Sequence, residues 1–294
     1  MPSDPQTFET YRPLLFSIAY RMLGSAMEAE DMVQETYLRY EMVQDNPIEF
    51  PKAYLSKIVT RLCLDQLKSA KTQRENYVGT WLPEPLLTGE STNVGFDERE
   101  TISMAFLVLL ENLSPIERAI FLLRDVFDYS YAEIAVIVGK SEANCRRYYH
   151  RAKQYLTERR PRFEPSSAEQ HKLIEGFIQA ITLGDVEGLT ELLAEDVVMY
   201  GDGGGKAAAT RHPLMGREAV IRLMFGSYRL IPPETQVQFA EVNGTPSLLF
   251  RQHDTLFYVI NFTIVDNKIS AIRGVLNPDK LVYLNQHSQG SQSS

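Results

Sequence analysis

The sequence has few of the features that mark secreted or membrane proteins. Its 294 residues include only two cysteines, Cys63 and Cys145, which lie far apart in the sequence within predicted helices. This arrangement favours reduced packing residues over a disulfide or metal framework. No run of about twenty apolar residues is present to span a bilayer. The N-terminus lacks a basic segment followed by an apolar core, the mark of a secretory signal. We therefore expect a cytoplasmic protein that does not associate with a membrane.

Recognisable catalytic motifs are also lacking. Neither cysteine has a His or Asp arrangement nearby that would make it a nucleophile. The run Gly203 to Lys206 does not match a P-loop, which requires Gly-x-x-x-x-Gly-Lys followed by Ser or Thr. We predict no catalytic residues, no metal site and no cofactor.

The chain length and residue patterns predict several domains. A composition of 44% hydrophobic and 23% charged residues is that of a soluble globular protein, and 294 residues suit two or three domains. Apolar residues recur at helical spacing through residues 1–75 and again through 98–160, where a helix is expected at about 97–112. Residues 76–97 are rich in Gly and Pro, hold the only Trp and form a linker, and 161–168 form a second one.

The C-terminal third has a different pattern. Residues 169–285 begin with helical segments and continue, beyond about Pro232, as β-branched and aromatic runs bounded by turn residues. We predict an α+β domain with helices first and a curved antiparallel sheet after them. The tail, 286–294, is predicted to be disordered.

The segment Ser130 to Lys153 predicts a helix-turn-helix. Ser130 and Glu133 form a capping box, Gly139 ends the first helix, and Ser141 caps the second. On the second helix an inward stripe is expected from spacings of three and four, made of Cys145, Tyr149, Ala152 and Leu156. One face of this helix therefore packs, and the other is charged.

The charge of this segment is opposite to that of the chain. The formal net charge is −8, yet residues 140–160 hold seven Lys and Arg against Glu142 and Glu158. Local positive charge on an acidic protein favours contact with DNA phosphates. The alternative is a solvated helix whose cations stabilise its C-terminal dipole.

Three segments in order resemble the sigma factors of the extracytoplasmic-function group. AEDMVQETYLR (29–39) resembles the segment that binds the clamp helices of RNA polymerase, and PKAYLSKIVTRLCLDQLK (51–68) resembles the minus-ten recognition helix. The cap at Ser114, the YAEIA helix and NCRRYYHRAK resemble the promoter-reading C-terminal module. The resemblance implies that residues 1–75 are sigma region 2 and residues 98–160 are sigma region 4.

The remaining residues resemble SnoaL-like domains, which have the cystatin-like or NTF2-like cone fold. A subset of this sigma group carries such a domain, and its marks are WLPEP (81–85), DGGGK (202–206) and NPDKL (277–281). The fold class implied is two small all-α domains followed by an α+β cone domain. The resemblance implies transcription initiation controlled by the attached domain.

These resemblances imply two sets of contact residues. The partner of the first is core RNA polymerase, at the clamp of its largest subunit, and its residues are Glu30, Asp31, Gln34, Glu35 and Arg39. The partner of the second is promoter DNA, and its residues are Lys57, Arg61, Lys68, Asn144, Arg146, Arg147, His150, Arg151 and Lys153. The loop Asp45 to Phe50 is a candidate pocket for an extruded base. A solvated helix face is the alternative reading for the first set.

The three motifs imply a third set, of regulatory contacts. Its residues are Trp81, Leu82, Pro83, Glu84, Pro85, Asp202, Gly203, Gly204, Gly205, Lys206, Asn277, Pro278, Asp279, Lys280 and Leu281. A proline-stiffened segment costs little entropy to dock. We hypothesise that it and the DGGGK loop bind each other or neighbouring surfaces and keep the two promoter-binding modules compact. The alternative is that the glycines only turn the chain.

The sequence leaves two further functions open. Related cone folds include isomerases and cyclases with an Asp or His in an apolar pocket, and the polar candidates here form no recognisable pair: Tyr200, Asp202, His212, His253 and Asp254. The C-terminal domain is also a candidate sensor of a small apolar ligand. A DNA-binding repressor would need a dimerisation element, and none is recognisable. The function that we predict is that of an alternative sigma factor, not an enzyme, regulated by its fused domain.

Overall fold

The structure is a computed structural model, and it describes residues 4–42, 48–88, 102–159 and 167–287. The candidate base pocket partly falls outside these ranges, as do residues 97–101 of the helix predicted for 97–112 and most of the predicted second linker and tail. The chain divides into two compact units. The first contains residues 1–76, 93–102 and 106–160, and the second contains 77–92, 103–105 and 161–294.

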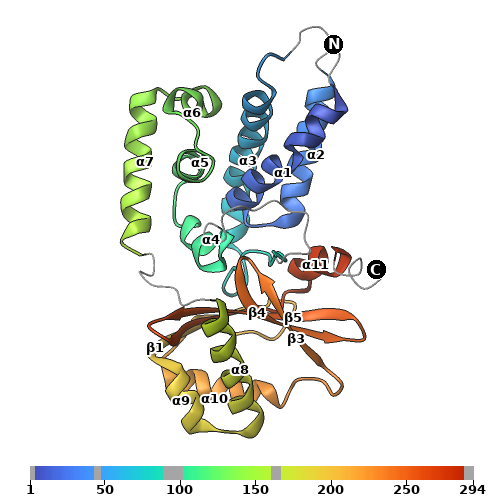
Figure 1. The fold of residues 1–294 in the computed structure, drawn as a ribbon, viewed down its shortest axis with the longest axis vertical. Helices are drawn as coiled ribbons and strands as arrows, with labels where there is room; N and C mark the ends of the chain where they lie inside the picture. The colour runs from blue at the N-terminus through green and yellow to red at the C-terminus, as the bar shows by residue number, and fades with distance from the viewer. Residues whose placement is uncertain (1–3, 43–47, 89–101, 160–166, 288–294) are drawn as a thin grey trace. The chain divides into compact units, whose positions relative to one another are not determined.

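The first unit is helical (Figure 1). Its helices are α1 (Pro5–Leu23), α2 (Ala26–Glu41), α3 (Pro51–Glu75), α4 (Met104–Leu110), α5 (Pro115–Phe121), the π-helical turn η2 (Leu122–Val126), α6 (Tyr131–Val138) and α7 (Glu142–Thr157). Gly24 ends α1 in the left-handed region at φ 70°, and Ser25 caps α2 by accepting a hydrogen bond from the Glu28 amide. The short loop therefore folds α2 back against α1.

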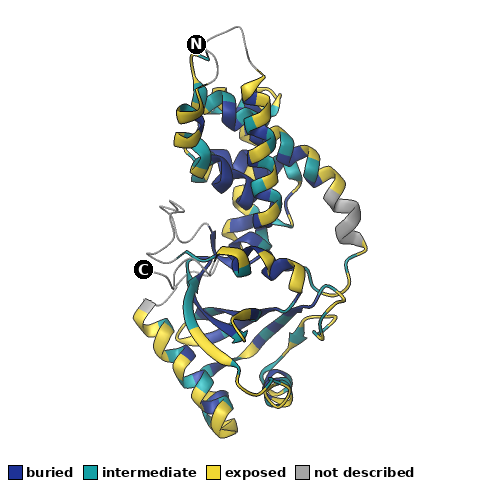
Figure 2. Ribbon diagram, turned by 90° about the vertical axis from the view of Figure 1, so that its right-hand side faces the viewer, coloured by how far each residue is buried: buried dark blue, intermediate teal, exposed yellow. Residues whose placement is uncertain are grey.

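Apolar stripes form the core of this unit. Fully buried side chains from α1 and α3, among them Leu15, Tyr20 and Leu55, pack together, and buried faces of the helices are turned inward (Figure 2). Helices α5 and α7 pack on each other, and α3 contacts both α5 and α6. Regions 2 and 4, as predicted from the sequence, therefore share one compact unit.

The second unit is α+β. Its elements are α8 (Ser167–Leu183), α9 (Val186–Leu192), β1 (Leu193–Asp202), β2 (Leu214–Met215), α10 (Arg217–Tyr228), β3 (Gln236–Val242), β4 (Thr245–Gln252), β5 (Thr255–Val265), β6 (Lys268–Val275), the 3-10 helix η3 (Pro278–Leu281) and α11 (Val282–His287). The sheet order is β2-β1-β6-β5-β4-β3. Helices α8, α9 and α10 cover one face of it (Figure 1), and their apolar side chains form the core together with those of the strands.

The sheet differs from the predicted one in a respect that matters for the site. Strands β3 to β6 form antiparallel pairs as predicted, but β1 pairs with β6 in parallel, so the sheet is mixed. A parallel neighbour requires a long crossover, here β2, α10 and three strands, and local patterns do not reveal it. Because β1 and β6 run in the same direction, their ends at Asp202 and Val275 lie side by side. Register shifts in three of the pairings bend the sheet.

Two segments are more ordered than the sequence indicates. Gln286 and His287, predicted to begin a disordered tail, belong to α11. Residues 77–88, predicted to belong to a linker, pack within the second unit and contain a single bridge, between Leu87 and Val242. The segment is not helical, because the prolines at 83 and 85 prevent helix formation.

Candidate promoter-binding surface and linker clamp

The helix-turn-helix forms from local signals as predicted. Ser130 and Glu133 make both hydrogen bonds of a capping box, and Gly139 ends α6 with φ 68°. Ser141 caps α7 by accepting a hydrogen bond from the Asn144 amide. The predicted inward stripe is confirmed, because the buried residues of α7 are Cys145, Tyr149, Ala152 and Leu156.

The cations of α7 lie on its exposed face, and most of them have partners. Arg146 binds Glu142 and lies over the Tyr131 ring, and Arg151 lies 3.2 Å from Glu117. Arg147 and His150 are exposed, and Asn144 is half-buried. Arg147 contacts the ring of the neighbouring Tyr148.

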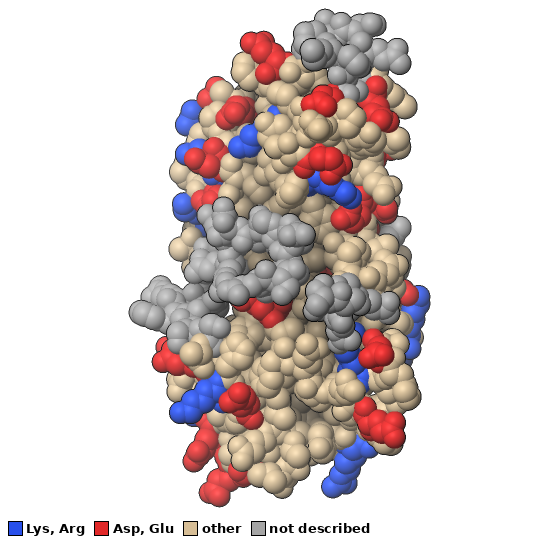
Figure 3. Space-filling view, turned by 45° about the vertical axis from the view of Figure 1, so that its right-hand side comes forward, with Lys and Arg blue, Asp and Glu red and all other residues tan. Residues whose placement is uncertain are grey.

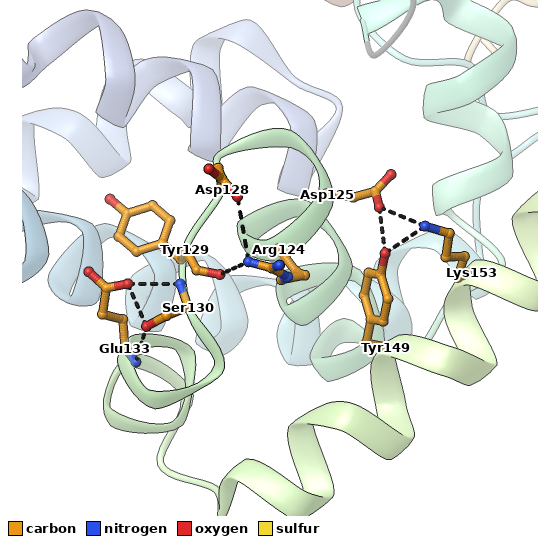
Figure 4. A network of polar contacts seen from close by, with 8 residues as sticks. All are labelled: Arg124, Asp125, Asp128, Tyr129, Ser130, Glu133, Tyr149 and Lys153. Atoms are coloured by element: carbon orange, nitrogen blue, oxygen red, sulfur yellow. Dashed lines mark hydrogen bonds and ion pairs between the residues drawn. The ribbon is translucent and has the colours of Figure 1, made fainter.

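Lys153 belongs to a network that joins α7 to the turn η2 (Figure 4). The Tyr149 hydroxyl donates to Asp125 at 2.6 Å, and the Lys153 ammonium lies 2.8 Å from that hydroxyl and 3.4 Å from the carboxylate. The hydrogen bond to Tyr149 and the charge of Asp125 raise the pKa of Lys153. Lys153, predicted to bind phosphate, therefore also stabilises the packing of α7.

The predicted minus-ten residues lie along α3 in different environments. Lys68 is exposed and pairs with Asp65, and Lys57 is half-buried. Arg61 donates from Nε to the Ile137 carbonyl at 3.0 Å and from a terminal nitrogen to the Val136 carbonyl at 3.4 Å. In this conformation the guanidinium of Arg61 therefore binds the C-terminal carbonyls of α6, the first helix of the helix-turn-helix.

Two further contacts join the helices of regions 2 and 4. Ser56 and Tyr129 share a buried hydrogen bond of 2.6 Å. The buried guanidinium of Arg118 in α5 donates to the Met22 carbonyl of α1 at 2.5 Å and to Glu111 at 2.7 Å. Spacing patterns contain no signal for either contact, because the partners are 73 and 96 residues apart.

The predicted polymerase-binding residues lie on one side of α2. Asp31 and Gln34 are exposed, Glu30 pairs with Arg12, and Glu35 pairs with Arg39. Leu38, which is 50% exposed, lies one turn beyond Gln34 on the same helix and was not predicted.

A buried carboxylate organises the contact between residues 77–82 and the cone domain. Asp202, at the end of β1, accepts hydrogen bonds from the Tyr77 hydroxyl at 2.5 Å and from the Leu82 amide at 2.8 Å. It also pairs with Lys280 at 2.6 Å, and the two side chains are 0% and 8% exposed. Asp202, Lys280, Tyr77, Trp81 and Leu82 are called the linker clamp below.

Lys280 completes the clamp. Its ammonium donates to the Leu82 carbonyl and lies 4.2 Å from the centre of the Trp81 ring and 4.9 Å from that of Tyr77. A cation between a carboxylate and two aromatic faces is satisfied although it is buried. The motifs at 81–85, 202–206 and 277–281 thus meet in space, while Tyr77 had no signal in the sequence beyond its position four residues before Trp81.

Close approach explains two of the three glycines. Gly204 has φ 56°, donates its amide to Asp202, and leaves room for the Asn277 side chain, which a methyl group would overlap. A methyl group on Gly203 would overlap the Ala207 carbonyl. Asn277 in turn donates to the Tyr77 hydroxyl at 2.9 Å. These glycines therefore do more than turn the chain, because their missing side chains bring the clamp residues together.

Residues 86–88 bind the β3–β4 turn through backbone groups. The Leu86 amide donates to the Asn243 side chain at 3.1 Å, and the Asn243 amide donates to the Leu86 carbonyl at 2.8 Å. The Thr88 hydroxyl accepts from the Gly244 amide at 2.7 Å. The role of Asn243 in binding this segment was not predicted. The Asn-Gly pair in the sequence indicates a turn, in which Asn243 has φ 53°, but it gives no signal for these hydrogen bonds.

The remaining motif residues have less central places. Pro83, Glu84 and Pro85 are buried, and Leu281 is buried after Pro278 opens η3. Lys206 pairs with Asp279 at 2.5 Å, but the two side chains are 57% and 61% exposed. The structure therefore contains one buried and one exposed ion pair within the same group of motifs.

The second unit also contains a largely apolar cavity of about 1080 Å³, open to the surface and lined by α8, α10 and the sheet. None of the five polar candidates for acid or base chemistry lines it: Tyr200, Asp202, His212, His253 and Asp254. In the described ranges no cluster of His, Cys, Asp and Glu is arranged to hold a metal ion.

Acidic and basic side chains are interspersed on the face that Figure 3 shows, and wide areas between them carry neither. Across residues 4–42, 48–88, 102–159 and 167–287, every helix is too short or too polar to cross a membrane.

Comparison with known families agrees with this geometry. Residues 7–73 match Sigma-70 region 2, and residues 103–156 match Sigma-70 region 4. The chain belongs to the extracytoplasmic-function RNA polymerase sigma factors. It is 35% identical over 286 residues to the ECF RNA polymerase sigma factor SigJ of Mycobacterium tuberculosis, covering 93% of this chain and 91% of SigJ.

Other relatives extend the match. The probable ECF RNA polymerase sigma factor SigI of the same organism is 29% identical over 290 residues, covering 93% of each chain. The crystal structure of Mycobacterium tuberculosis SigJ superposes with a TM-score of 0.76 and 31% identity, covering 95% of this chain and 98% of that one. The predicted fold class, two helical sigma regions followed by an α+β domain with a curved sheet, is confirmed.

Proposed function

We propose that this sigma factor binds core RNA polymerase and promoter DNA, and that its C-terminal domain controls promoter binding through the linker clamp. The observation that carries the regulatory part is the buried Asp202–Lys280 pair, which holds the segment between regions 2 and 4 on the C-terminal domain. The exposed face of α7 and the cationic side of α3 support DNA as a partner, and the exposed polar face of α2 supports polymerase.

The contact between regions 2 and 4 supports a closed state. The minus-thirty-five and minus-ten elements are about 25 base pairs apart, which is about 85 Å of B-DNA at about 3.4 Å per base pair. A module of about 70 residues has a radius of gyration of about 11 Å. Two such modules that touch through Arg61 and α6 are too close to occupy both elements. Promoter binding therefore requires them to separate.

The clamp opposes this separation. Tyr77 and Leu82 bind the two oxygens of one carboxylate, so the chain between them folds around Asp202. If extended, the same residues would span about 17 Å. Release of the clamp lengthens the connection between the two modules by this extended segment. A small change in the docking free energy of the segment therefore shifts the fraction of molecules that is open and able to bind promoter DNA with polymerase.

Association with polymerase tests the first part of the proposal. The purified full chain is expected to bind polymerase that lacks its own sigma subunit and to direct run-off transcription from a subset of genomic fragments. A chain that neither binds core polymerase nor directs transcription would contradict it.

Truncation tests the regulatory part. A chain ending near Ser167 lacks Asp202 and Lys280, so its linker is free, and we expect more run-off transcript per molecule bound to polymerase than from the full chain. Circular dichroism of the truncated chain checks that the helical unit is folded. Equal transcription by the two chains, both folded, would reject control by the C-terminal domain.

Arg147→Ala is predicted to weaken promoter binding. Arg147 is exposed on α7, and loss of an arginine that reads a base costs about 1–3 kcal/mol, or about 5- to 150-fold in affinity. Arg159→Ala is the control, because Arg159 is exposed and lies two residues beyond the end of α7. It is expected to lower the affinity by less than Arg147→Ala, and equally for all DNA sequences. Equal effects of both variants on specific and non-specific DNA would contradict base reading by Arg147.

A further inference from the structure

The cavity of the C-terminal domain has the dimensions of a ligand site. Its volume of about 1080 Å³ is slightly above the range of about 300–1,000 Å³ that is usual for pockets that bind drug-sized molecules. Its wall is mostly aliphatic and aromatic, with Phe177, Met199, Leu223, Leu248, Phe250 and Ile260 as examples. Leu230, at the cavity, is 81% exposed, so the apolar wall continues to the surface.

Polar groups occur at one end of the cavity. The Tyr258 hydroxyl lies over Gly274 of β6, so close that a Cβ at this position would be only 2.7 Å away. Burial raises the pKa of Tyr258, which therefore stays protonated at neutral pH. Gly201 is the partner of Gly274 in the pairing of β1 with β6, and the Thr210 hydroxyl lies beside Gly201. Two hydroxyl groups thus lie at this end, and that of Thr210, which is buried, makes no hydrogen bond among the residues that the structure describes.

The charge of the cavity wall selects the kind of ligand. The wall contains Glu234 but no Lys, Arg or His among its described residues. A buried carboxylate ligand would have no cation to pair with, which makes its burial costly. The wall therefore fits a neutral, largely hydrocarbon molecule that carries one hydroxyl or carbonyl group.

The polar end of the cavity is the reverse side of the linker clamp. Gly201 lines the cavity and the next residue is Asp202, and likewise Leu276 lines it and the next residue is Asn277. Thr210 lines the cavity, while its carbonyl lies against Gly79, which belongs to the docked segment. The amides of Leu276 and Asn277 both donate to the Asp202 carbonyl. One thin wall therefore serves both sites.

We propose that this cavity binds a neutral apolar molecule through the Tyr258 and Thr210 hydroxyl groups, and that its binding strengthens the docking of residues 77–82. The inference rests on the proposed regulation by the clamp. A ligand that bonds to Thr210 and fills the space beside Gly201 orders the wall against which Gly79 and Leu82 pack. The docked segment then loses less freedom on the ordered wall, which is positive coupling. The filled cavity thus keeps the sigma factor closed.

Ligand class is tested by titrating the full chain with N-phenyl-1-naphthylamine, a neutral fluorescent probe. We expect saturable binding, displacement by dodecanol, and at least tenfold weaker displacement by dodecanoate. Tyr258→Phe removes one hydroxyl and is expected to weaken the binding of dodecanol about five- to tenfold. Tyr155→Phe, outside this domain, is the matched control. Absence of saturable binding, or preference for the carboxylate, would overturn the assigned ligand class.

Coupling is tested by hydrogen exchange of the Leu82 amide, which donates to Asp202. Saturating probe is expected to slow its exchange about tenfold, within the usual range of couplings. By reciprocity, Asp202→Asn, which releases the docked segment, should weaken the binding of the probe by the same factor. Unchanged exchange with the probe bound would overturn the coupling. Because neither readout uses polymerase or DNA, such a failure is distinguishable from a chain that binds ligand but does not direct transcription.

Discussion

Asp202→Asn is expected to release residues 77–82 from the C-terminal domain. The substitution leaves the buried ammonium of Lys280 without its carboxylate, and removing one member of a buried ion pair costs about 3–5 kcal/mol. Trp81 is the only Trp of the chain and lies over Lys280, so its fluorescence reports the release. We expect a red-shifted emission, faster exchange of the Leu82 amide, and more run-off transcript per bound polymerase.

Two further variants make this prediction specific. Asp279→Asn removes the exposed pair with Lys206 and should change stability by less than about 1 kcal/mol, with Trp81 emission unchanged. Asp202→Asn combined with Lys280→Met removes both charges and should recover part of the lost stability, because apolar replacement of a buried pair is often nearly neutral. If Asp202→Asn leaves the Trp81 spectrum and the Leu82 exchange rate unaltered, the clamp does not hold the linker.

Arg118→Met is expected to destabilise the helical unit by about 3–5 kcal/mol, because the substitution removes a buried guanidinium that pairs with Glu111 and donates hydrogen bonds to two carbonyls. The Arg118 side chain is only 4% exposed, and burial lowers its pKa to about 9, so it carries its charge at neutral pH. Urea unfolding of the full chain measures the loss.

The control for Arg118 is Arg124→Met in the neighbouring turn η2. Arg124 lies 3.5 Å from Asp128, which is 96% exposed, and donates one hydrogen bond to the Tyr129 carbonyl at 3.0 Å. An exposed pair contributes about 0–1 kcal/mol and a single hydrogen bond about 0.5–1.5 kcal/mol, so we expect a smaller loss of stability than for Arg118→Met. The two variants remove the same charge and keep a similar side-chain volume. Equal unfolding midpoints for the two variants would show that the contact from α5 to the end of α1 adds nothing to the stability of the unit.

The sequence predicts those parts of the structure that depend on neighbours in the chain. The capping box of Ser130 and Glu133, the end of α6 at Gly139 and the buried stripe of α7 are all set within a few residues. The motifs at 81–85, 202–206 and 277–281 predict contacts among three distant segments, and the structure brings Trp81, Asp202 and Lys280 together. Their regulatory role stays a prediction.

The parts that the sequence did not predict depend on distant residues. The parallel pairing of β1 with β6, which places Asp202 beside the end of β6, joins segments about 70 residues apart. Tyr77 and Asn243 bind across still longer separations through hydrogen bonds that any Tyr or Asn can make. At one end of the cavity the side chains of Thr210 and Tyr258 come close to Gly201 and Gly274, and such close approaches have no periodic signal in the sequence.

The bond from Arg61 to the end of α6 has a consequence for the salt dependence of promoter binding. The carbonyls of Val136 and Ile137 occupy the negative end of a helix dipole, so they present oxygen acceptors of the kind that a DNA phosphate presents. If Arg61 binds DNA in the proposed open form, it exchanges one set of acceptors for another. Phosphate neutralisation then releases counterions, whereas the internal contact releases none, so low ionic strength favours the open form bound to DNA over the closed protein.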